Sequence, residues 1–196
     1  MTVLNIDNAY FIDKLTEYIG QDVLLFGLDG MSYYGLLQEI DANNIATLLP
    51  ASLSSTGLVE IQNPAEVAAV LNTVSIELCR VIAFGYDITA DPFVIPNDED
   101  EDVPPQESSA ASEMSSECCE PVCDTTTLIG KLIEAHQVVA VSTLGGFIFA
   151  GRIKMLRHKL LKLESEYVFA PGGDGSTLFS IGKTVINLDA STAVGS

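Results

Sequence analysis

Six basic side chains in the last third of the chain could bind an anionic ligand: Arg152, Lys154, Arg157, Lys159, Lys162 and Lys183. Alternate residues of a strand share a face, so Arg152 and Lys154 are expected side by side. The pattern is compatible with a solvated strand face, with docking of an acidic protein surface, or with RNA contact. A formal net charge of −18 disfavours nucleic acid, because it repels a phosphate backbone.

Three of the four cysteines gather in the stretch Cys118-Cys119-Glu120-Pro121-Val122-Cys123. A structural zinc site usually needs four ligands in paired spacings, and no histidine lies nearby to complete a set. Disulfides formed by Cys118, Cys119 and Cys123 in an oxidising setting, or unpaired thiols in the cytoplasm, remain the alternatives. Cys79 lies in a strand-like run and is expected to face a core.

The motifs of common enzyme classes are missing from the sequence. His136 and His158 are its two histidines, and neither has a neighbouring nucleophile or acidic partner in an expected pattern. The chain carries no Gly-Lys-Thr phosphate loop and no His-Glu-x-x-His metal motif. We therefore expect no catalytic residues, no cofactor, no metal and no enzymatic activity.

The elements that would position these residues form an internal repeat. At an offset of 116, Val23 aligns with Val139, Gly30 with Gly146 and Gly35 with Gly151. Each half begins with an apolar helical stripe, over residues 10–19 or 128–133. A strand, a glycine turn and a second strand that contains a glycine follow, and such a glycine marks a sharp bend.

A third strand and a closing pair of strands complete each predicted half. The closing pairs are expected at Val74–Val81 with Ala83–Asp87, and at Leu178–Ile181 with Thr184–Leu188. Before the first of these pairs, residues 64–70 predict a helical turn.

The charge distribution divides the chain into a first module over residues 1–96, a linker over residues 97–124 and a second module over residues 125–196. Residues 98–124 hold 10 acidic and no basic side chains, and apolar residues are few. Such a composition cannot bury enough surface to offset its ordering entropy, so a disordered tether is expected.

These residues resemble the Sm-like family. Its first signature is matched by apolar alternation, a glycine turn, an aromatic–glycine pair and an Asp/Asn turn: Val23, Leu25, Gly30, Tyr34, Gly35, Leu37, Asp41 and Asn44. The second half offers Gly146, Phe149, Gly151, Ile153 and, as a second signature with a glycine between the last two strands, residues 181–185. The resemblance implies a mainly β fold with two small, strongly bent five-stranded Sm-like barrels, each with a short N-terminal helix.

Sm-like RNA binders usually carry an Asn at one turn and an Arg or Lys at another within one module, and neither half carries both in matching form. The chain is also similar to an uncharacterised Sm-like group of spore-forming bacteria, which implies a coat or packaging role. No stretch predicts a signal peptide or a membrane span, so we expect synthesis in the cytoplasm and a final place there or at a spore surface.

These observations predict a non-enzymatic structural or interaction protein of tandem Sm-like modules, a spore-coat or envelope component that assembles through β-edges. Each half is expected to pair through its fourth or fifth strand, with its sister half or another chain. Its partner would be protein, chiefly by self-association, and not a membrane. The alternative is an RNA-binding Sm-like protein that uses the basic hairpin of the second module.

Overall fold

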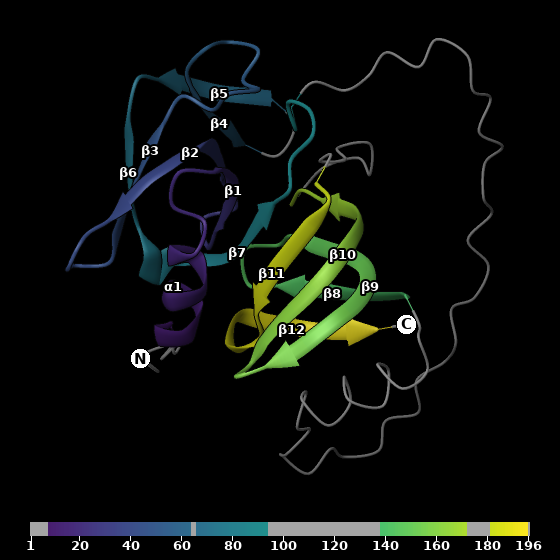
Figure 1. Cartoon of the computed structure of the whole chain (residues 1–196). Helices are drawn as coiled ribbons and strands as arrows, with labels where there is room; N and C mark the ends of the chain where they lie inside the picture. Colours follow the sequence, from purple (N-terminus) through teal and green to yellow (C-terminus); the bar gives the residue numbers. More distant parts are fainter. Residues whose placement is uncertain (1–7, 64–65, 94–137, 172–180, 196) are drawn as a thin grey trace, which may run out of the picture.

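Antiparallel β structure dominates the described part of the chain. The computed structural model describes residues 8–63, 66–93, 138–171 and 181–195. In these residues, twelve strands form one continuous hydrogen-bonded sheet (Figure 1). No described helix is long and apolar enough to cross a membrane. The prediction of a mainly β fold is confirmed.

The first half, up to residue 93, opens with α1 (Ala9–Thr16), which buries Phe11 and Leu15. Its strands are β1 (Asp22–Gly27), β2 (Ser32–Ile40), β3 (Ile45–Leu49), β4 (Val59–Asn63), β5 (Glu66–Leu71), β6 (Val74–Glu77) and β7 (Val81–Tyr86). The spatial order is β7-β1-β2-β3-β6, and the β4–β5 hairpin branches from β2. A 3-10 turn, η1 (Leu78–Arg80), separates β6 from β7.

The second half, from residue 138, repeats this order without the branch. Its strands are β8 (Val138–Thr143), β9 (Ile148–Arg157), β10 (Leu160–Phe169), β11 (Lys183–Asn187) and β12 (Ser191–Gly195), with η2 (Leu188–Ala190) before the last strand. The spatial order is β12-β8-β9-β10-β11. The acidic linker and the second predicted helix lie outside the described residues.

The glycines at the two strand bends are required for the same reason in both halves. A Cβ on Gly35 would lie 2.7 Å from the carbonyl oxygen of Leu49, and a Cβ on Gly151 would collide with the carbonyl oxygen of Glu164. In each case the second strand passes so close to the third that only glycine fits. The sequence alignment of these two glycines therefore has a physical basis.

The predicted helical turn at residues 64–70 is wrong. Residues 66–71 form β5, which pairs with β4. The alanine and glutamate residues of this segment favour a helix by their intrinsic propensity. In the folded chain the segment instead pairs with β4, a strand that the sequence did not indicate.

The predicted closing pairs need two corrections. In the second half, residues 183–187 form the fourth strand rather than the fifth, and the fifth is β12. Gly182 therefore precedes the fourth strand and does not lie between the last two. In the first half, η1 interrupts the predicted strand Val74–Val81, and its Cys79 is exposed rather than in a core.

Two apolar cores run through the sheet, and both draw residues from both halves. In one, Leu24, Phe26 and Ile82 pack with Val141, Phe149 and other residues of the second half. In the other, α1 and β1 pack with Leu160 and Val185. The halves therefore share their cores where they meet.

Candidate functional site

Direct strand pairing joins the two halves. β7 runs antiparallel to β11, with Phe84 opposite Val185 and Ala83 opposite Ile186. β7 is the last strand of its half, and β11 is the fourth of the other. A Cβ on Gly85 would lie 2.6 Å from Cγ2 of Ile181, so glycine allows that side chain to cover the strand. The prediction that a fourth or fifth strand edge pairs with the sister half is confirmed for this junction.

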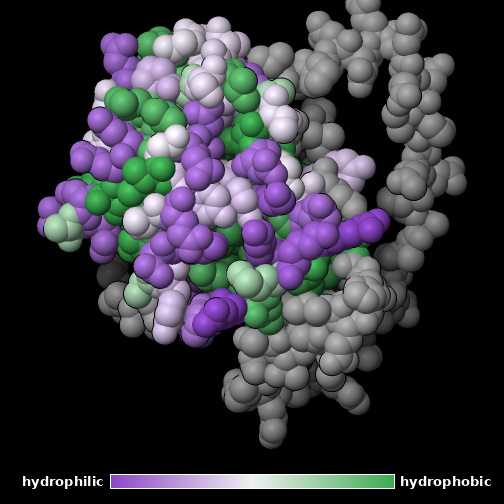
Figure 2. All heavy atoms as spheres, in the orientation of Figure 1, coloured by the Kyte–Doolittle hydropathy of each residue, from purple (hydrophilic) through white to green (hydrophobic). Residues whose placement is uncertain are grey.

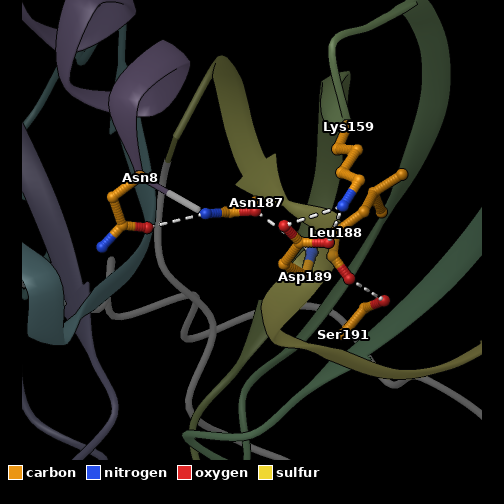
Figure 3. A network of polar contacts seen from close by, with 6 residues as sticks. All are labelled: Asn8, Lys159, Asn187, Leu188, Asp189 and Ser191. Atoms are coloured by element: carbon orange, nitrogen blue, oxygen red, sulfur yellow. Dashed lines mark hydrogen bonds and ion pairs between the residues drawn. The ribbon is translucent and has the colours of Figure 1, made fainter. Parts of the chain in front are cut away.

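A buried polar network crosses the same junction (Figure 3). Asn187 Nδ2 donates to Asn8 Oδ1 at 2.8 Å, and Asn8 Nδ2 donates to the Leu78 carbonyl at 3.1 Å. The Asp189 amide donates to Asn187 Oδ1 at 3.1 Å. Asn8 directly precedes α1 but makes no capping bond with its side chain. Sequence reasoning missed both asparagines, although a polar residue at the end of an apolar closing strand is a usable signal.

Two of the six predicted interaction residues contact the first half. Lys183 Nζ lies 2.6 Å from Asp87 Oδ2, and that carboxylate raises the pKa of Lys183. Lys162 Nζ lies 5.2 Å from the centre of the Tyr86 ring, a cation–π distance. These lysines thus connect strands from both halves.

The other four predicted residues also have partners inside the chain. Lys154 bonds Glu164 at 2.6 Å and lowers the pKa of that carboxyl, and Lys159 bonds Asp189 at 2.9 Å. Arg152 lies opposite Glu164 in the strand register. Figure 2 shows hydrophilic residues over both halves on the face it draws, rather than in the second half alone.

The β9–β10 turn contacts α1. His158 stacks on Tyr10, with ring centres 4.2 Å apart and ring planes 6° apart, and Arg157 Nε donates to His158 Nε2 at 3.1 Å. His158 and Lys159 both have positive φ, which is uncommon for residues with side chains. This contact holds a turn of the second half against the helix of the first.

Two strands at the ends of the sheet path keep one free edge each among the described residues: β6 in the first half and β12 in the second. β6 has the position in its half that β11, the fourth strand, has in the other, and β12 has the position of β7, so these are the same kinds of strand that meet in the junction. A groove of about 280 Å³ lies beside β6, lined by Gly27, Asp29, Tyr33, Ser75, Ile76, Glu77 and Arg80.

Backbone hydrogen bonds fix the correspondence between the halves at these edges. The Leu28 amide donates to the Arg80 carbonyl at 2.8 Å, and the Leu144 amide donates to the Ala190 carbonyl at the same distance. The Leu78 amide donates to the Asn44 carbonyl, and the Leu188 amide donates to the Lys159 carbonyl in the same way. Residues 74–85 thus correspond to residues 184–195.

The described residues contain no group of three or more His, Cys, Asp or Glu side chains arranged to hold a metal ion. The cysteines proposed to form disulfides, Cys118, Cys119 and Cys123, lie outside the described residues.

No family model and no curated protein matches the chain. Among solved structures, it is similar to the Sm protein of Pyrococcus abyssii in complex with a uridine heptamer, at 20% sequence identity and a TM-score of 0.31. That similarity covers 37% of this chain and 92% of the other.

Proposed function

We propose that this protein is a non-enzymatic assembly protein of two Sm-like modules, whose copies join head to tail through β6 of one copy and β12 of the next. The strand order carries the proposal. In each half the first strand pairs with the last, and among the described residues the sheet path ends in β6 and β12, each with one edge unpaired. An unpaired edge with free amides and carbonyls is a template for another strand.

The edges are complementary rather than identical, so the contact is head to tail. Copies joined in this way close into a ring when the rotation from one copy to the next is a whole fraction of a full turn. Otherwise they form a filament. The β7·β11 junction gives an example of the same contact inside the chain.

The junction also supplies the register. Because Ala83 faces Ile186 and Phe84 faces Val185, the corresponding residues between copies are Ala193 facing Ile76, and Val194 facing Ser75. Gly195 would face Val74, as Gly85 faces Thr184. Leu71, 47% exposed, corresponds to Ile181 and would cover Gly195 as Ile181 covers Gly85.

Cross-linking in this register tests the proposal. In a chain whose four native cysteines are serine, Ser75→Cys with Val194→Cys should give disulfide-linked multimers on mild oxidation. The matched control, Ser75→Cys with Ser191→Cys, places the thiols three residues out of register and should stay largely uncrosslinked. Equal cross-linking of both pairs would indicate random collision and contradict the register.

RNA binding through Arg152, Lys154, Arg157, Lys159 and Lys183 is the second candidate. Partners inside the chain for these cations favour a structural role over a phosphate site. Arg157→Glu should leave oligouridine binding at low salt unchanged. A steep salt dependence that this variant removes would favour the RNA function instead.

A coat or envelope setting belongs to the same proposal, with Cys118, Cys119 and Cys123 as its cross-links after export from the cytoplasm. Under oxidising conditions these thiols should add reductant-sensitive links to an assembly that already exists. The variant with all three replaced by serine should assemble to the same mass in reductant and lose only the covalent links. An assembly that vanishes with reductant would make the cysteines, and not the strand edges, the joining device.

A further inference from the structure

The third strand is built differently in the two halves. In the second half, β10 follows β9 from Leu160 to Phe169, with local bulges. In the first half, β3 and β4 share that role along β2, and residues 50–58 form a loop between them. The loop is therefore an insertion with no counterpart in β10.

Carboxylates from three different segments hold this loop. Asp22 of β1 accepts from the Ser52 amide at 3.0 Å, and Asp91 accepts from the Ser55 amide at 2.6 Å. Oε1 of Glu60, on β4, accepts from the hydroxyl of Ser54 at 2.5 Å and of Thr56 at 2.9 Å. Donors from residues 52–56 of the loop thus bind all three carboxylates.

Three buried oxygen atoms beside the loop have no hydrogen-bond partner: Glu60 Oε2, Gln62 Oε1 and the Tyr34 hydroxyl. Glu60 and Tyr34 are fully buried, and Gln62 is 6% exposed. Tyr34 lies opposite Glu60 in the strand register, and Gln62 follows two positions along β4. Their side chains therefore share one face of the sheet.

The electrostatics of Tyr34 show what its hydroxyl faces. Burial raises the pKa of Tyr34, and Asp22, Asp91 and Glu60 raise it further. No described Lys or Arg side chain acts on it in the opposite direction. The Tyr34 phenol thus lies within the electrostatic reach of three carboxylates.

A buried carboxylate oxygen without a donor or a counter-charge is costly. Carboxylate, amide and hydroxyl oxygens are the ligands that hard cations such as Ca²⁺ accept, in flexible geometries completed by water. We propose that a hard metal cation of the calcium class binds at this inserted loop, with Glu60 as its charged ligand and Gln62 and Tyr34 as neutral oxygen ligands.

Terbium luminescence tests the site directly. Tb³⁺ substitutes for Ca²⁺ and emits when a nearby aromatic ring absorbs, and this chain has six Tyr and no Trp to do so. The full chain should show tyrosine-sensitised emission that excess Ca²⁺ displaces. Tyr34→Phe, which removes only the hydroxyl, should weaken Tb³⁺ binding at least tenfold, whereas Tyr167→Phe in the second half should not. Equal titration curves for both variants would overturn the proposal.

Thermal unfolding supplies the second measurement, because the acidic stretch at residues 98–102 also attracts cations. In protein first treated with a chelator, Ca²⁺ near 100 times its dissociation constant should raise the unfolding midpoint by about 5–11 °C. Glu60→Gln should lose most of that shift, and the matched surface variant Glu164→Gln should keep it. The unfolding midpoints of wild type and Glu60→Gln should therefore be compared in Na⁺, K⁺, Mg²⁺ and Ca²⁺. If the two midpoints differ by the same amount in all four, water fills the site and the proposal fails.

Discussion

The closed β7·β11 junction and the two open edges use the same kinds of strand with different side chains. Inside the chain, Phe26 packs edge-on against Phe147 and Phe149, with ring centres 5.0 Å apart. The residues that correspond to Phe26 and Ile82 at the open side are Ser142 and Thr192. Both halves share one backbone plan, but on the β8–β12 side small polar side chains stand where the junction buries Phe26 and Ile82.

This difference teaches how one fold supports two strengths of contact. Backbone pairing sets the geometry in both places, and side-chain burial sets the free energy. We therefore expect the junction to hold permanently and the contact between copies to be reversible.

The largest effect is expected at Phe26, which is fully buried. Phe26→Ala should lower the free energy of unfolding by about 3–5 kcal/mol, because a cavity opens between the halves. The corresponding open-side change, Ser142→Ala, should stay within about 0.5 kcal/mol. Urea unfolding of both variants measures the contrast, and similar losses would show that the two sides do not differ as described.

The buried asparagine pair should come next. Asn187→Ala leaves Asn8 Oδ1 without its donor, which should lower the free energy of unfolding by about 1–3 kcal/mol. Asn8→Ala in the same chain should add less than its own separate cost, since the pair acts together. Glu77→Ala, at the corresponding position of the open edge, is the control. Additive losses for the two asparagines would contradict the pairing.

Alkaline pH should weaken the fold through tyrosines on both sides of the comparison. Burial is the main cause that raises the pKa of Tyr18, near the junction, and of Tyr33, in the open groove, to about 12 from 10.0. The folded state favours the neutral phenol, so this stability is complete below pH 10 and is lost between pH 10 and pH 12. Urea midpoints across this range should fall less for Tyr18→Phe than for wild type. An equal fall would show that Tyr18 does not contribute to the loss of stability at alkaline pH.

The smallest effect is expected for the exposed ion pair of Lys183 with Asp87. Both side chains are partly in solvent, at 39% and 54% exposure, so water and salt screen their attraction. Lys183→Ala should shift the unfolding midpoint less than Asn187→Ala does, and 1 M salt should remove the difference from wild type. A loss that persists in salt would mean that Lys183 acts through packing rather than charge.

The parts of the fold that the sequence could predict depend on local chemistry. Gly35 and Gly151 marked the bends because no other residue fits beside the third strand. The β4–β5 hairpin escaped prediction because its pairing with β2 is set by the tertiary fold. The second closing pair was predicted one strand too early. The last strand, β12, has the sequence Ser-Thr-Ala-Val-Gly, which has too few apolar residues to predict a strand.

The candidate site was predicted in part for a similar reason. The grouping of basic residues singled out Lys162 and Lys183. It did not indicate that each of them would contact the first half. Nothing local to Asn8 and Asn187 indicates that residues 179 positions apart share a hydrogen bond. Contacts of that kind depend on how the halves meet, which the repeat alone does not specify.

The mass of the full-length protein in reductant, measured by light scattering over a range of concentrations, tests the central claim most directly. We expect a mass several times 20.9 kDa that falls on dilution, and a monomer for Ser75→Lys, which places a charge on the β6 edge, but not for Ser75→Thr. A wild-type protein that stays at 20.9 kDa at every concentration would contradict assembly through the open edges.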